Sequence, residues 1–106
     1  MADVYTKRFL AAAVTNNALT VQVPAGVVWI VTNMVASGGP FSAPVTANAY
    51  LPGPVSFWAG VLAAGSVAQT SFWEGRIPLA AGEDLEVEVR GGGLYIVVSG
   101  YELSSP

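Results

Sequence analysis

The sequence predicts an all-β protein built as a single antiparallel β-sandwich or barrel of about eight strands. Short runs rich in valine, threonine and aromatic residues alternate with clusters of glycine, proline, asparagine and serine, a spacing typical of such folds. Helical periodicity is nearly absent, and the apolar stretch at 11–14 is too short to form a stable helix alone. The length of 106 residues is that of one domain, so residues 1–106 are expected to form one unit.

The expected strands follow one another at regular intervals. They lie near residues 4–10, 18–23, 27–36, 45–51, 55–62, 67–77, 84–90 and 94–103. Leu85, Val87 and Val89 alternate with charged residues, which predicts one face toward a core and one toward solvent. The same alternation occurs at 19–23. Residues 1–10 are expected to form an extended N-terminal arm or an edge strand.

Two segments carry more specific predictions. Residues 27–36 are apolar in both alternating sets, which is typical of a strand buried on both faces. Residues 91–93 are three consecutive glycines, and glycine readily adopts the positive φ of a tight turn. The strands at 84–90 and 94–103 are therefore expected to pair as an antiparallel hairpin.

Charge is scarce and unevenly distributed. Charged residues make up 10% of the chain and hydrophobic residues 53%, whereas soluble domains are usually about a quarter charged. Positions 9–73 carry no charge at all. A domain this small cannot bury all of its apolar surface, so the sequence predicts contacts with other subunits. Residues 27–62 are expected to lie in that interface.

Nucleic acid and membrane are both unfavourable partners. The net charge is −3 with four basic residues, too few to neutralise a phosphate backbone. The apolar run at 23–31 is interrupted by Pro24 and Gly26, and it is shorter than the roughly 18–20 residues of a spanning helix. The N-terminal residues do not resemble a signal peptide, so the chain is expected to be soluble and not exported.

The groups needed for catalysis or metal binding are also scarce. The chain has no histidine and no cysteine, which removes the commonest general base and the thiolate ligands. Glu86 and Glu88 stand two apart on one strand, and their expected role is a solvated face beside Arg90. Glu83 and Asp84 lack the pattern of a calcium loop. We therefore expect no enzyme activity, no metal and no cofactor.

Aromatic residues are the best candidates for contacts with other molecules. The candidate interface residues are Trp29, Tyr50, Phe57, Trp58, Trp73, Glu74 and Arg76. Trp58 is the preferred interface aromatic, while Trp29 and Trp73 fit either a core or an interface. Glu74 and Arg76 flank Gly75 on one face and are expected to pair within or between subunits. A sugar-stacking platform formed by Trp29, Trp58, Trp73, Tyr50, Tyr95 and Tyr101 is the alternative.

Two stretches resemble a known family. FWEGRIPLAAGEDLEVEV at 72–89 and VVSGYEL at 97–103 resemble the C-terminal half of small jelly-roll proteins carried by tailed bacteriophages. VPAGVVW at 23–29 resembles the start of a strand in the same group, and together these parts cover about half of the chain. Cupins and trimeric tumour-necrosis-factor-like domains share the turn motif, but this chain lacks the histidine cluster of metal-binding cupins.

The resemblance implies a jelly-roll sandwich with a structural role. The expected function is that of a non-enzymatic capsid decoration or minor capsid (cement) protein, which stabilises or coats the phage head. Its partners would be copies of itself, with a trimer favoured, and the major capsid protein or other virion subunits. It would be made in the host cytoplasm and lie on the capsid surface. A head-tail or tail accessory protein, or a carbohydrate-binding jelly roll on the virion, is the alternative.

Overall fold

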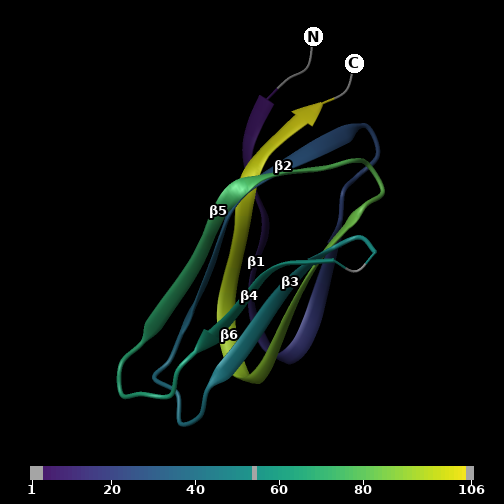
Figure 1. Ribbon diagram of the computed structural model, residues 1–106. Helices are drawn as coiled ribbons and strands as arrows, with labels where there is room; N and C mark the ends of the chain where they lie inside the picture. The colour runs from purple at the N-terminus through teal and green to yellow at the C-terminus, as the bar shows by residue number, and fades with distance from the viewer. Residues whose placement is uncertain (1–3, 54, 105–106) are drawn as a thin grey trace.

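The computed structural model describes residues 4–53 and 55–104, and within them it contains strands and turns without a helix (Figure 1). The strands are β1 (Val4–Gln22), β2 (Val27–Gly38), β3 (Val45–Leu51), β4 (Val55–Leu62), β5 (Gln69–Leu79) and β6 (Asp84–Ser104). All of the strand pairs are antiparallel. The all-β prediction is confirmed, and the described residues hold no helix able to cross a membrane.

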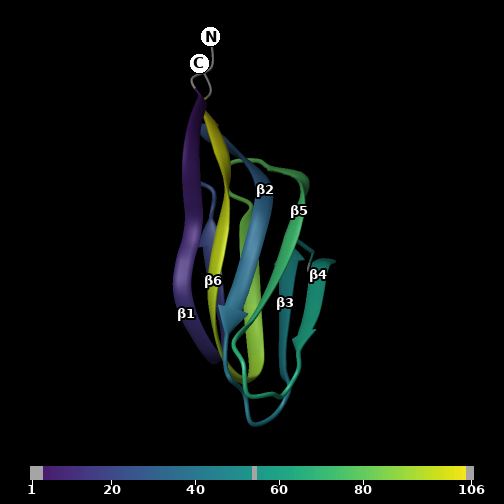
Figure 2. The same ribbon diagram turned by 90° about the vertical axis from the view of Figure 1, so that its left-hand side faces the viewer.

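The strands form two layers that share β1 and β6. In the front layer, residues 4–15 of β1 pair with the C-terminal part of β6, which pairs with β2, and β2 pairs with β5. In the back layer, residues 17–22 of β1 pair with residues 84–89 of β6, and β6 is followed by β3 and then β4. Figure 2 shows the front layer facing the viewer, with β3 and β4 behind it. Two four-stranded antiparallel layers form the expected jelly-roll-like sandwich.

The strand count and the hairpin at the glycine triplet need correction. There are six continuous strands, because β1 and β6 each pass from one layer to the other without a break. The segments 84–90 and 94–103 are consecutive parts of β6 and pair with other strands. Gly91 has a φ of 87°, and an added Cβ there would lie 2.8 Å from the carbonyl oxygen of Pro44. The glycines therefore allow a crossing between layers, where the sequence had suggested a turn.

The prediction that 27–36 is buried on both faces is wrong for the second half of β2. Thr32 is an extra residue in the register with β6, while β5 has two residues, Gly75 and Arg76, opposite it, and such a bulge shifts the alternation by one residue. Trp29 and Val31 face the core before the bulge, and Met34 and Ala36 face it afterwards. Before the bulge the odd-numbered residues of β2 face the core, and after it the even-numbered residues do. Both alternating sets are therefore apolar in sequence, although the strand has one buried face.

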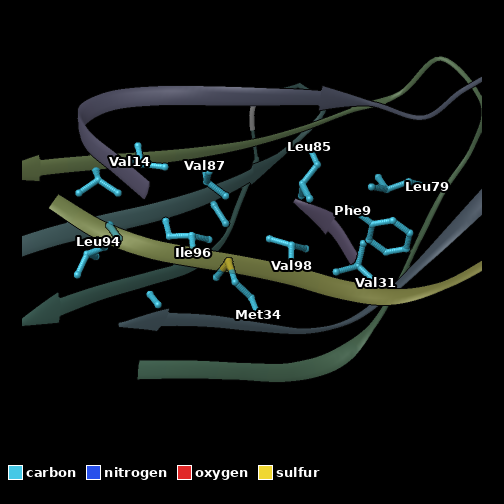
Figure 3. Close-up of a cluster of buried hydrophobic side chains, with 14 of the residues drawn as sticks. Phe9, Val14, Val31, Met34, Leu79, Leu85, Val87, Leu94, Ile96 and Val98 are labelled. Atoms are coloured by element: carbon cyan, nitrogen blue, oxygen red, sulfur yellow. The ribbon is translucent and has the colours of Figure 1, made fainter. Parts of the chain in front are cut away.

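The core lies between the two layers (Figure 3). Its buried residues are Phe9, Val14, Val23, Trp29, Val31, Met34, Ala36, Val45, Ala47, Ala49, Leu62, Leu79, Leu85, Val87, Val89, Leu94, Ile96 and Val98. The alternations predicted at Leu85, Val87 and Val89 and at 19–23 are confirmed, because these apolar residues lie in or against this core. Each fully buried aliphatic side chain contributes about 1.5–3 kcal/mol by leaving water.

A glycine in β6 permits its closest approach to β2. A Cβ added to Gly100 would lie 1.9 Å from the carbonyl oxygen of Ile30, and both groups belong to paired strands of the front layer. We expect Gly100→Ala to lower the free energy of unfolding by about 3 kcal/mol, because one strand must move. Urea denaturation followed by tryptophan fluorescence measures this loss. Gly65→Ala is the control, since its Cβ would meet no atom closer than 3.8 Å, and an equal loss in both variants would contradict the prediction.

Candidate assembly surface

The outer face of the front layer exposes large hydrophobic side chains from three strands. The exposed fractions are 65% for Phe72 on β5, 49% for Tyr95 on β6 and 37% for Val35 on β2. Small residues of β1, Ala11 and Ala13, are exposed on the same sheet. We call the outer surface formed by Ala11, Ala13, Val35, Ser37, Thr70, Phe72, Tyr95 and Val97 the apolar face.

The strand register arranges these residues in rows across the sheet. Val35 lies opposite Phe72 on one side and opposite Val97 on the other, and Ala11 follows beyond Val97. In the next row, Ser37 lies between Thr70 and Tyr95, with Ala13 beyond Tyr95. Neither row contains a charge. Cross-strand neighbours of this kind are in contact, so the face is continuous.

A polar row borders the apolar face. Arg8, Ser99, Asn33 and Glu74 lie opposite one another across β1, β6, β2 and β5. The Ser99 hydroxyl donates a hydrogen bond to Oδ1 of Asn33. Arg8 and Glu74 are exposed at the two ends of this row, and within the described residues neither side chain forms an ion pair or a hydrogen bond. The row therefore carries one free charge of each sign, at opposite sides of the sheet.

A shallow hollow lies where the apolar face meets this polar row. It has a volume of about 280 Å³ and is lined by Asn33, Val35, Thr70, Phe72, Trp73 and Glu74. Phe72 and Val35 are apolar lining residues, and Glu74 is the acidic one. The hollow suits a side chain with an apolar stem and a cationic head.

The outer face of the back layer has a different character. Arg90 lies 3.1 Å from Glu88 in an ion pair, and its side chain is 58% exposed. Thr20 and Tyr50 lie on either side of Glu86 in the register. The prediction that Glu86, Glu88 and Arg90 form a solvated face is confirmed by this arrangement.

The edges of the two layers are protected to different degrees. The β5 edge carries Glu74 and Arg76, and Pro78 cannot donate a backbone hydrogen bond; charge and proline both discourage strand addition. The β4 edge carries neither charge nor proline. Val55 and Val61 on β4 are 55% and 69% exposed. The β4 edge is thus a second apolar region, on the opposite layer.

Trp29, one of the candidate interface residues, lies in the core. Only 4% of it is exposed, and its ring stacks on Phe9 with centroids 4.4 Å apart. The indole Nε1 donates a hydrogen bond to Oε1 of Glu102 at 3.0 Å, and the same oxygen accepts one from Lys7 Nζ at 3.1 Å. Almost none of the Trp29 ring is left for a neighbouring subunit.

Phe57, Trp58 and Trp73 close the open side of the sandwich between β4 and β5. All three are half-buried and pack against the core, and the rings of Phe57 and Trp73 meet edge to face with centroids 5.1 Å apart. Each tryptophan covers a glycine two residues further along its strand. An added Cβ would lie 2.7 Å from Trp58 at Gly60 and 2.5 Å from Trp73 at Gly75.

The sequence Phe-Trp-x-Gly occurs twice, at 57–60 and 72–75, once in each of these two strands. This repeat is the signal that could have identified Trp58 and Trp73 as inward-facing. A glycine within a strand often marks a close approach, and here the covering group is the strand's own tryptophan ring. Trp58 was the preferred interface aromatic from the sequence, but its ring packs mainly against residues of its own chain.

Tyr50, Glu74 and Arg76 are the remaining candidates. Tyr50 is half-buried and lines a hollow of about 190 Å³ with Thr20, Leu51, Pro52, Gly53, Asp84 and Glu86. The Arg76 guanidinium lies 5.9 Å from the centroid of the Tyr101 ring. It makes no ion pair with Glu74 among the described residues. The structure thus does not bring the three together into one site.

Of the carboxylates weighed for catalysis or metal binding, Asp84 and Glu86 line one hollow, and Glu88 pairs with Arg90. Glu83 Oε1 accepts a hydrogen bond from the backbone N–H of Ala80 at 2.7 Å, so it stabilises its own turn. Residues 4–53 and 55–104 contain no group of three acidic, histidine or cysteine side chains placed to hold a metal.

Phe72 and Val35 are exposed residues of the apolar face that the sequence did not indicate, whereas Tyr95 was one of the rings of the alternative sugar-stacking platform. Alternation offered a signal for Phe72, because it is adjacent to Trp73 and must face away from it. Val35 was concealed by the bulge at Thr32. The apolar face lies partly outside 27–62, since β5 and β6 contribute to it.

Comparison with known proteins gives distant similarities. No protein-family model matches the chain, and no curated protein matches it. It is similar to a chain in the structure of infectious bursal disease virus, Gx strain, at 11% identity and a TM-score of 0.41, over 98% of this chain and 32% of that one. For the Gt strain the identity is 9% and the TM-score 0.31, over 97% and 30%. This chain spans about a third of the length of those chains, and the fold assignment rests on its own strand order.

The contacts around Trp29 predict a dependence of stability on pH. The hydrogen bond from Trp29, and then the one from Lys7, hold the pKa of Glu102 below its ordinary value of 4.5. The ionised carboxylate therefore stabilises the fold above pH 4.5, and this contribution disappears as the pH falls through the lowered pKa. We expect Glu102→Gln to lose stability at neutral pH and to show a flatter acid limb in denaturation midpoints measured from pH 7 to pH 3.

Glu86→Gln is the matched control for that experiment. The Glu86 side chain has no hydrogen bond or ion pair within the described residues, so its removal should leave the acid limb as steep as in the unsubstituted protein. An acid limb that is equally steep in Glu102→Gln would contradict the assignment.

Proposed function

We propose that this protein is a non-enzymatic structural subunit of a virus particle, which assembles with copies of itself and with other virion subunits. Within that role we propose a decoration or minor capsid protein on the head of a tailed bacteriophage. The particle would be its place of action, and the host cytoplasm its place of synthesis. The alternative is a head-tail or tail accessory protein, which would also assemble with copies of itself and with other virion subunits.

The observation that carries this proposal is the apolar face. Phe72, Tyr95 and Val35 lie in adjacent rows on one side of a rigid sheet, where a soluble monomer would expose polar side chains. Large apolar patches on a protein surface mark sites of association. Exposed aromatic rings on a flat sheet give such a site its affinity.

The distribution of charge adds a second argument. The back layer presents Glu86, Glu88 and Arg90, which keep that side hydrated. A subunit with one hydrated face and one apolar face is suited to lie on a surface or in a shell. The resemblance of 72–89 and 97–103 to small phage jelly-roll proteins agrees with this use.

Sugar binding is less well supported. Trp29, Trp58 and Trp73 all face the core, so their rings do not form an exposed stacking platform. Of the tyrosines in that platform, Tyr95 is exposed but has only Ala13 and Ser37 as cross-strand neighbours, and Tyr50 lines a hollow that also contains acidic side chains. One ring beside two carboxylates supports a weaker case than the apolar face does.

The proposal predicts that the chain is present in particles in a fixed copy number. We expect quantitative mass spectrometry of purified particles to give a constant ratio of this chain to the major shell protein through repeated gradient purification. Deleting its gene should leave particles that lose their contents at lower temperature. A chain that is absent from particles, or that washes off without a fixed ratio, would contradict the proposal.

A glycan array probed with the purified chain separates the alternative. The virion subunit proposed here should bind no glycan. Binding that disappears in Tyr50→Ala, with no chain in the particles, would instead support the carbohydrate-binding role.

A further inference from the structure

We propose that the apolar face binds the apolar face of a second copy of this chain, forming a two-fold symmetric pair. The inference rests on the proposed role as an assembly subunit and specifies which surface is used and in what orientation. It places Arg8 of each copy in the hollow beside Glu74 of the other. A pair thus replaces the trimer that the sequence favoured.

The orientation follows from the symmetry of a sheet packed on its own copy. Two such sheets pack with their strand directions within about 30° of each other. A two-fold axis that lies between the faces and runs along the strands places β5 over β1 of the second copy, and β2 over β6. This rotation does not move a row along the strand direction. Each row therefore lies over the same row of the second copy, with the order of the four strands reversed.

Applied to the polar row, this axis pairs opposite charges. Glu74 at the β5 end meets Arg8 at the β1 end of the second copy, and Arg8 meets Glu74 in return. In the middle of the row, Asn33 faces Ser99. Both charges are exposed and without an ion-pair partner in their own chain, within the residues described. The same axis thus gives each free charge of the polar row a partner of opposite sign.

The hollow strengthens this pairing. It lies between Glu74 and Phe72 on the β5 side of the face and has a volume of about 280 Å³. The methylene stem of Arg8 can lie against Phe72 while its guanidinium meets the Glu74 carboxylate, which is the geometry an arginine favours.

The uncharged rows are complementary in size under the same axis. Phe72 lies over Ala11 of the second copy, Tyr95 lies over Ser37, and Val35 lies over Val97. A large residue therefore meets a small one at both aromatic positions, as close packing requires. Two Phe72 rings never meet each other.

The other in-plane axis gives a poor match. A two-fold axis perpendicular to the strands inverts the order of the rows and places Glu74 and Arg8 over the row of Thr70 and Ala13. Each charge would then be covered by residues that cannot pair with it, at a large desolvation cost. The charges thus select the axis along the strands.

The area is that of a small, reversible contact. The four strands are spaced about 4.8 Å apart and the three rows about 6.7 Å apart, which gives about 400 Å² of sheet on each copy. The pair buries about 800 Å², at the low end of the range for specific interfaces.

A charge exchange tests the pairing in the full-length chain. We expect Arg8→Glu and Glu74→Arg each to raise the dimer dissociation constant about tenfold to a hundredfold, measured by sedimentation equilibrium or native mass spectrometry. The double variant should return the constant to within a few-fold of the original, because the ion pairs reform with reversed polarity. Failure of the double variant to recover would overturn the proposed orientation.

A second comparison tests the face itself. Phe72→Asp and Val61→Asp place the same charge on side chains of nearly equal exposure, 65% and 69%, in different layers. We expect Phe72→Asp to give a folded monomer and Val61→Asp to remain paired, with circular dichroism verifying the fold of both. A monomeric unsubstituted chain, a trimer, or dissociation by Val61→Asp alone would overturn the inference.

These results are separable from those for the proposed function. A chain present in particles at a fixed ratio, whose association is unaffected by Phe72→Asp, would sink the pairing and leave the virion role intact. A pair that dissociates in Phe72→Asp, from a chain that is absent from particles, would do the reverse.

Discussion

The structure depends on β6 serving both layers of the sandwich. Its first part pairs with β1 and β3, and its second part with β1 and β2. Among the described strands, only the pairs β2–β5 and β3–β4 do not include β6. The inward side chains of both parts are fully buried, from Leu85 to Val98. The crossing requires a residue with positive φ and almost no side-chain volume, which the glycines at 91–93 supply. Any substitution that stiffens this crossing acts on both layers at once.

That constraint explains why the outer faces differ. Because β6 crosses between layers, its charged outward residues before the glycines belong to the back layer, and its uncharged outward residues after them belong to the front layer. β1 crosses in the same way near Asn16, which has a φ of 45° and whose Oδ1 accepts a hydrogen bond from the Gly91 N–H. The two crossings are therefore held together, and one chain gains a hydrated face and an apolar face without a second domain.

The sequence predicted the fold class and most strand positions, because period-two alternation and turn residues are local signals. Its errors share a physical cause. The bulge at Thr32 and the crossing at 91–93 depend on what neighbouring strands do, and neither is visible in the alternation of one strand. Trp29 and Trp58 show the same limit for the candidate site: an aromatic residue in a strand is equally consistent with core and surface until the register is known. Glu102, which accepts hydrogen bonds from Trp29 and Lys7, is distant from both in sequence and could not be assigned to them.

The uncharged segment 9–73 acquires a different meaning from the structure. It supplies eleven of the eighteen core residues, but about half of its described residues are exposed, so burial explains only part of its lack of charge. The association surface that we propose consists of eight outward positions on four strands, and two of these positions, Tyr95 and Val97, lie outside that segment. Each row of the apolar face combines one aromatic residue, Phe72 or Tyr95, with an alanine of β1. Under the pairing that we propose, this order places each aromatic ring over a small residue of the second copy, as close packing of a self-complementary face requires.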